Sequence, residues 1–96
     1  MTLPLRLRIV QVVNQAGGGL LSTGEIYELL RGEYGLERQF DLRQMDWHLT
    51  CVRAVGLLEG LEPYWGDDGR PYLKYRITEA GRKKLAWLGE VEDKEN

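Results

Sequence analysis

The sequence is poor in cysteine and histidine, because Cys51 and His48 are the only residues of these types among its 96 residues. A single cysteine excludes a disulfide within the chain and fits a reducing compartment. No apolar run approaches the roughly 18 residues of a membrane-spanning helix, so no membrane contact is expected. The first residues, MTLPLRLRIVQVV, lack the small-residue cleavage site of a signal peptide. These absences predict a cytoplasmic protein, and the length of 96 residues predicts one domain with a modest apolar core.

Catalytic signatures are also missing. The chain has no Gly-x-Ser-x-Gly motif, no phosphate-binding loop and no dinucleotide fingerprint. Its carboxylates are scattered, and nothing in the pattern pairs them for acid–base chemistry. His48 and Cys51 are three positions apart, but tetrahedral zinc needs four ligands, which only two chains together could supply. A packed histidine and a buried thiol are the favoured interpretation, so we expect no enzyme, no metal and no cofactor.

An excess of basic residues is absent too, since the net charge is −2. The charges are unevenly distributed, however. Residues 70–84 carry six basic side chains and one acid, whereas residues 25–62 carry four arginines and eight acids. Local potential rather than net charge steers a polyanion to a protein surface. The basic segment therefore favours nucleic-acid binding, and the acidic body favours the alternative of a protein partner.

The most informative stretch runs from Phe40 to Gly60, with the sequence FDLRQMDWHLTCVRAVGLLEG. Asp41 is suited to be a helix N-cap, and Gly56 to be the left-handed residue that ends a helix. One face is apolar at helical spacing, with Leu42, Met45, Leu49 and Val52. The opposite face and its flank carry Arg43, Gln44, Trp47 and Thr50. The pattern predicts a helix with a buried back and a front that is open to a partner.

Two helices are expected before this stretch. An apolar stripe predicts the first over residues 5–16, and three glycines at 17–19 end it. Leu20–Leu21 predicts a very short strand. Ser22 and Glu25 form a capping box that opens the second helix. Its inward residues are expected to be Ile26, Leu29 and Leu30, and its last residue Gly35.

A hairpin is expected after the stretch. A strand begins at Leu57–Leu58 and runs to Trp65, and the turn at residues 66–69 is rich in residues that tolerate positive φ. In the return strand, residues 70–77, alternation predicts an inner face of Leu73, Tyr75 and Ile77. The same alternation predicts a basic outer face of Tyr72, Lys74 and Arg76. This pattern indicates a half-buried hairpin with a basic exterior.

A last helix is capped by Thr78, and the acidic segment 90–96 is expected to be disordered. The order helix, short strand, helix, helix, strand, turn, strand, helix is the topology of a winged helix-turn-helix domain. We therefore predict an α+β fold that is mainly α, with a three-helix core, a β-hairpin wing and a C-terminal helix. The winged-helix domain is expected to cover residues 1–89.

Two sequence patterns resemble those of a known family. The motif HLxxVxxxGLL over residues 48–58 is similar to the end of the recognition helix in ArsR-, MarR- and PadR-type regulators. The motif YRITEAGRKKL over residues 75–85 resembles the PadR-type junction between a strand and a helix. Asp46 departs from the family, which usually has a tyrosine there. The resemblance implies a cytoplasmic, homodimeric transcriptional repressor that binds double-stranded DNA and responds to a small-molecule effector or to stress.

Candidate site residues follow from the exposed faces. The expected DNA contacts are Arg43, Gln44, Trp47 and Thr50 on the helix after Phe40, and Arg70, Lys74 and Arg76 on the wing. The expected dimer contacts are Trp87, Leu88 and Val91 on the last helix. A competing hypothesis is a winged-helix protein-interaction module without DNA binding. In that case Trp47 and Trp87 would anchor partner surfaces.

Overall fold

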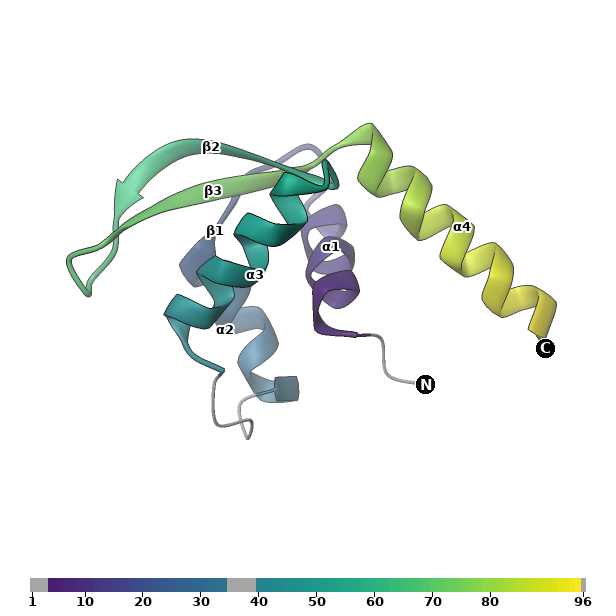
Figure 1. Ribbon diagram of the computed structural model, residues 1–96, viewed down its shortest axis with the longest axis horizontal. Coiled ribbons are helices and arrows are strands. Elements are labelled where there is room, and N and C mark those ends of the chain that lie inside the picture. Colours follow the sequence, from purple (N-terminus) through teal and green to yellow (C-terminus); the bar gives the residue numbers. More distant parts are fainter. Residues whose placement is uncertain (1–3, 35–39, 96) are drawn as a thin grey trace.

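The computed structural model describes the chain over residues 4–34 and 40–95, with side chains up to residue 89 (Figure 1). Its elements are α1 (Leu5–Gln15), β1 (Leu21–Ser22), α2 (Thr23–Tyr34), α3 (Leu42–Ala54), β2 (Leu58–Trp65), β3 (Pro71–Ile77) and α4 (Glu79–Glu95). This order confirms the predicted winged helix-turn-helix topology. The predicted end of the second helix at Gly35 lies outside the described residues. None of the described helices is long and apolar enough to cross a membrane.

One apolar core joins α1, α2 and α3 to the sheet. Its most buried side chains, each at most 2% exposed, include Ile9, Val13, Ile26, Leu30, Met45, Leu49, Leu58 and Tyr75. Burying a side chain of this size stabilises a fold by roughly 1.5–3 kcal/mol. The wing leaves this body on one side and α4 leaves it on the other, with α3 lying between them (Figure 1). The front of α3 is therefore flanked by the wing.

The helix caps form as the sequence predicts. The Glu25 amide donates to the Ser22 hydroxyl and the Ser22 amide donates to the Glu25 carboxylate, both at 3.0 Å. The Gln44 amide donates to the Asp41 carboxylate at 2.8 Å, which fixes the start of α3. Gly56 ends α3 with φ of +83°. Its amide donates to the Arg53 carbonyl and the next amide donates to the Val52 carbonyl, so α3 ends in a Schellman motif.

A close backbone contact joins the end of α3 to the start of α4. The Thr78 hydroxyl donates to the Gly56 carbonyl at 2.6 Å and accepts from the Gly81 amide at 3.0 Å. The Thr78 amide donates to the Leu57 carbonyl at 3.2 Å. A Cβ at Gly81 would lie only 2.3 Å from that same carbonyl oxygen. The helix can approach the turn this closely because glycine has no side chain.

The sheet has the order β1-β3-β2, and both of its described strand pairs are antiparallel. The register pairs Leu58 with Ile77 and then shifts between Leu61 and Tyr64. Glu62, at this bulge, has φ of +46°. The extra residue re-aims the strand, and the Tyr64 hydroxyl accepts from the Gly24 amide at 3.1 Å. The bulge therefore ties the wing to the first turn of α2.

Three details differ from the sequence expectations. The short strand forms at Leu21–Ser22, one residue later than predicted. Leu29 was predicted to face inward but is 57% exposed. Leu30 already fills the core-facing side of α2, and consecutive helix positions lie about 100° apart. Tyr72 was predicted on the outer face but is only 3% exposed. Its ring packs beside Tyr64 and over Gly66, where the hairpin bends.

Helix α4 is longer than the sequence analysis anticipated. It continues to Glu95 and so takes in most of the acidic segment 90–96, for which disorder was predicted. Glutamate, which supplies three of the seven residues of this segment, has high helix propensity. The domain boundary at residue 89 stays a prediction.

Candidate functional site

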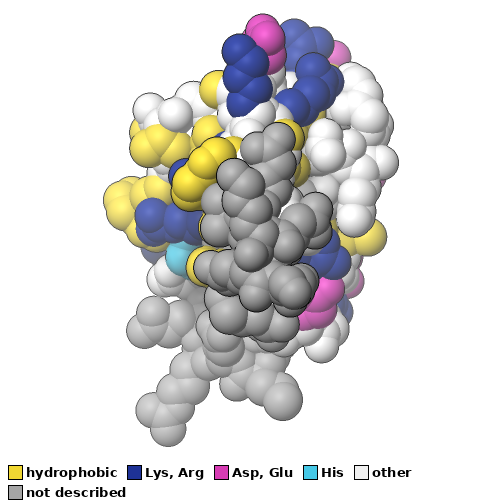
Figure 2. All heavy atoms as spheres, turned by 90° about the vertical axis from the view of Figure 1, so that its right-hand side faces the viewer, with side chains coloured by type: hydrophobic (Ala, Val, Ile, Leu, Met, Phe, Trp, Pro, Cys, Tyr) yellow, Lys and Arg dark blue, Asp and Glu magenta, His cyan; other side chains and the backbone are white. Residues whose placement is uncertain are grey.

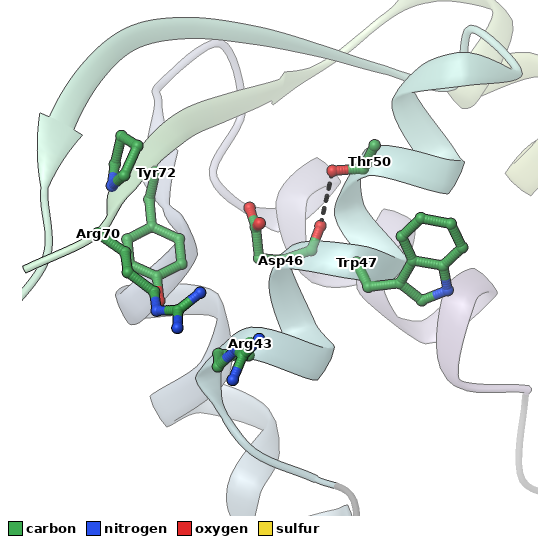
Figure 3. A pocket seen from close by; sticks show the side chains of 7 residues that line it. Arg43, Asp46, Trp47, Thr50, Arg70 and Tyr72 are labelled. Atoms are coloured by element: carbon green, nitrogen blue, oxygen red, sulfur yellow. Dashed lines mark hydrogen bonds between the residues drawn. The ribbon is translucent and has the colours of Figure 1, made fainter. Parts of the chain in front are cut away.

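A notch of about 310 Å³ lies between α3 and the wing. Its walls are Arg43, Asp46, Trp47, Thr50, Arg70, Pro71 and Tyr72. Figure 3 shows Asp46 pointing towards the wing residues Tyr72 and Arg70, whereas Trp47 points away from the wing. The structure thus brings together four of the predicted contacts, which are Arg43, Trp47, Thr50 and Arg70.

The residues of α3 that line the notch are three or four positions apart in the sequence. Arg43, Asp46 and Thr50 therefore line one face, with Trp47 beside them and 57% exposed. The Thr50 hydroxyl donates to the Asp46 carbonyl at 2.9 Å. That donation uses the hydroxyl proton within the helix, and the Thr50 side chain also shares a hydrogen bond with Tyr75, so the methyl group is the part of Thr50 best placed to meet a partner.

The wing residues that line the notch follow the hairpin turn, which is ordered by hydrogen bonds. Asp68 accepts hydrogen bonds from the Tyr72 hydroxyl and, at 3.0 Å, from the Arg70 amide. The bond from Tyr72 holds the pKa of Asp68 below its ordinary value. Burial and the same bond raise the pKa of Tyr72 to about 12. The Asp68–Tyr72 pair therefore stays intact at neutral pH, and it fixes the backbone that carries Arg70.

A carboxylate sits among the cations of the notch. Partial burial raises the pKa of Asp46 above its ordinary value of 3.8, against the opposing charge of Arg53, while Asp68 adds to the rise. A raised pKa means that the charged form of Asp46 is held at a cost to the fold. The electrostatics of the notch thus combine two exposed arginines with one disfavoured negative charge.

Replacing Asp46 with asparagine is expected to stabilise the fold at neutral pH. Protonated Asp46 contributes stability that is fully present below 3.8, the pKa of this residue in the unfolded chain. The contribution is lost as pH rises through the higher pKa of Asp46 in the folded protein. The advantage of Asp46→Asn should therefore be absent near pH 3 and develop as pH rises. Urea denaturation across this range measures it, with Asp67→Asn as the control. Equal effects of the two substitutions would contradict the electrostatic explanation.

The outer face of the wing carries paired charges. Arg76 contacts Glu59 at 3.0 Å and Lys74 contacts Glu62 at 3.6 Å. Residues 58–77 hold four carboxylates and three cations, for a net charge of −1. Neither Lys74 nor Arg76 lines the notch, and nor does Gln44. These three predicted contacts are thus separate from the cluster that the fold assembles.

The last helix presents an apolar and basic strip. Trp87 is 54% exposed, with the Lys84 ammonium 5.1 Å from its ring centroid, and Leu88 is half-buried. Lys83 pairs with Glu79 at 3.5 Å. Figure 2 shows Lys and Arg side chains gathered near the top of this view, over the start of α4. Val91 lies outside the described side chains.

Sequence patterns did not reveal one contact between helices. The Arg6 guanidinium on α1 donates to His48 Nδ1 on α3 at 3.2 Å. This bond places another exposed cation beside the front of α3, and no local spacing rule links positions 42 residues apart. Within the described part of the chain, no three His, Cys, Asp or Glu side chains gather to hold a metal ion.

No family sequence model matches the chain, and no curated protein sequence matches it either.

Several solved structures share the fold. Bacillus subtilis PadR in complex with operator DNA superimposes with a TM-score of 0.61 at 20% identity, covering 88% of this chain and 47% of that one. A PadR-like transcriptional regulator from Bacillus cereus gives 0.63 at 17% identity, covering 91% and 79%. A Thermoplasma acidophilum protein named as a putative transcriptional regulator gives a TM-score of 0.60 at 17% identity, covering 93% of this chain and 84% of that one.

These likenesses confirm the predicted fold, a PadR-like winged helix. The chain spans about half the length of the Bacillus subtilis PadR chain that it matches. Two of the three neighbours are named as transcriptional regulators, and the third is named as PadR bound to operator DNA.

Proposed function

We propose that the protein is a DNA-binding transcriptional regulator that acts in the cytoplasm. The observation that carries the proposal is the notch, where the fold aligns Arg43 on α3 with Arg70 on the wing. Helix α3 enters the major groove, which is about 12 Å wide and admits an α-helix. The operator DNA bound to a neighbour of the same fold supports this choice of partner.

Four residues of the notch have distinct parts in this proposal. Arg43 presents a forked guanidinium that suits the two acceptors of guanine. Arg70, on the ordered wing turn, contacts phosphate and so fixes the register of α3 without selecting sequence. Trp47 covers a sugar edge or a thymine methyl with its exposed ring. Asp46 lowers the affinity for DNA of any sequence, because its negative charge repels phosphate.

Lys74 and Arg76 remain proposed backbone contacts. Their partners Glu62 and Glu59 hold them in exposed ion pairs, and such pairs contribute only about 0–1 kcal/mol. Lys74 and Arg76 therefore lose little free energy when they leave these glutamates to contact phosphate. Because Lys74 and Arg76 lie outside the notch that Arg70 lines, we expect them to contribute less to binding than Arg70 does.

The proposal includes a homodimer built on α4. Trp87 and Leu88 are the proposed interface residues whose side chains the structure describes. Val91 continues the apolar strip of α4 in sequence. Trp87→Ala is expected to shift the protein from dimer to monomer in sedimentation velocity, because aromatic anchors dominate such interfaces. Trp65→Ala is the matched control, since Trp65 is 75% exposed on the wing and should leave the dimer intact. An unchanged sedimentation coefficient for Trp87→Ala would exclude this interface.

Selection from random duplexes tests the proposed function. A dimer that places two copies of α3 in successive major grooves should enrich inverted repeats with half-site centres about 34 Å apart. A reporter whose promoter overlaps such a repeat should lose expression, as expected of a repressor. If no duplex is enriched, the three exposed tryptophans favour a protein-interaction module instead.

A further inference from the structure

A second hollow, larger than the notch, runs between α2 and the wing. Its volume is about 960 Å³. Its apolar wall includes Leu29 from α2 and Tyr64 and Trp65 from β2, and its acidic residues are Glu25, Glu28 and Asp67. We call this hollow the wing groove. None of the residues proposed to contact DNA lines it.

The apolar surface of the wing groove is poorly covered. Trp65 is 75% exposed and Leu29 is 57% exposed, and both line the groove. The hydrogen bond from the Gly24 amide to the Tyr64 hydroxyl, at 3.1 Å, fixes the distance between α2 and the wing. The groove is thus held open by the fold, while its large apolar side chains remain in contact with water.

The charge of the wing groove has one sign. No lysine or arginine is among its described lining residues. Glu28 contacts Arg31 at 3.4 Å, but this pair is about 60% exposed on both sides and leaves the carboxylate accessible. A hollow with acidic walls raises the local concentration of cations and repels nucleic acid and organic acids.

Together these features define the chemistry of an occupant. A planar ring is needed to cover Trp65 and Leu29, and a positive charge is needed to match the acidic residues. Trp65 itself adds attraction, since a tryptophan face binds cations better than other rings do. We propose that the wing groove is a binding site for a small aromatic cation, with its ring against Trp65 and its charge towards Asp67 and Glu28. The site is independent of the proposed DNA function.

Calorimetric titration with two naphthalene compounds tests this site in the absence of DNA. The cation 2-naphthylmethylammonium and the anion 2-naphthoate share a ring and differ in the sign of their charge. The cation is expected to bind at least about tenfold more tightly than the anion. Equal affinity would overturn the proposed charge selection, and no binding of the cation would overturn the site.

Matched variants of exposed residues locate the binding. Trp65→Ala is expected to weaken binding of the cation about tenfold, whereas Val55→Ala, which changes a 70% exposed apolar residue outside the groove, should leave it unchanged. Asp67→Asn should weaken the cation but not the anion. Circular dichroism checks that each variant is folded. Equal effects of Trp65→Ala and Val55→Ala would overturn the location. Self-association that Trp65→Ala abolishes, without cation binding, would assign the groove to a second copy of the chain instead.

Discussion

Replacing Gly81 with alanine is expected to destabilise the fold by about 3 kcal/mol, the upper part of the usual range for overpacking. The new Cβ would lie 2.3 Å from the Leu57 carbonyl oxygen and 2.8 Å from an Ile77 side-chain carbon. The oxygen cannot move away freely, because it accepts the hydrogen bond from the Thr78 amide. Relief of the clash must therefore separate α4 from the turn that ends α3.

Gly89→Ala provides a control within the same helix. A Cβ at Gly89 meets nothing within 4 Å, so alanine there should gain up to about 1 kcal/mol from helix propensity. Urea denaturation of both variants measures the contrast. Equal stabilities of Gly81→Ala and Gly89→Ala would show that α4 does not pack on the turn as described.

The second large effect concerns Arg43. Arg43→Lys keeps the positive charge but loses the fork that contacts two acceptors at once, so it should reduce discrimination between sequences by about 1–3 kcal/mol. Arg70→Lys keeps the charge at a proposed phosphate contact and should change affinity little. Arg70→Gln should weaken binding to all sequences and lower the salt slope by about 1. Fluorescence anisotropy with a selected operator and a scrambled duplex measures each quantity.

Arg31→Gln is the matched control for loss of charge. It removes one cation from α2, where Arg31 is paired with Glu28, and should leave both affinity and salt slope nearly unchanged. An effect equal to that of Arg70→Gln would mean that net charge, rather than the notch, sets the affinity. Unchanged discrimination in Arg43→Lys would remove Arg43 from the proposed contacts with bases.

Local chemistry explains why much of the fold was predictable. The capping box at Ser22, the N-cap at Asp41 and the left-handed Gly56 each act over a few neighbouring residues. Such signals are complete within a short window of sequence. Helix α3, which carries most of the notch, is bounded by two of them. Its position and its buried face were therefore predicted correctly.

The charges of the wing were less predictable, because the relevant neighbours lie across the hairpin. Counting along residues 70–84 finds a basic segment, but Arg76 lies opposite Glu59 in the register. The bulge at Glu62 changes the register towards the tip of the hairpin, where Tyr72 is buried beside Tyr64. A backbone irregularity of this kind has no clear local signature. Arg70 lines the notch together with residues of α3, a proximity that neither strand predicts alone.

Gly81 illustrates a different limit. The motif around it resembled a family pattern, but spacing alone could not supply the reason for a glycine. The structure supplies it, because Gly81 meets the Leu57 carbonyl, which is 24 positions earlier in the chain. A glycine that is required by a distant backbone contact looks, in sequence, like any other glycine in a helix.

Anisotropy of a labelled generic duplex, titrated with the protein at several salt concentrations, tests the central claim of DNA binding most directly. A docking surface with several phosphate contacts predicts a dissociation constant of roughly 10⁻⁴ to 10⁻⁶ M at physiological salt. Affinity should rise steeply as salt falls, because counterions are released from the phosphates on binding. No binding at low salt, by protein that remains folded, would contradict the claim and leave a protein partner as the better explanation of the exposed α3.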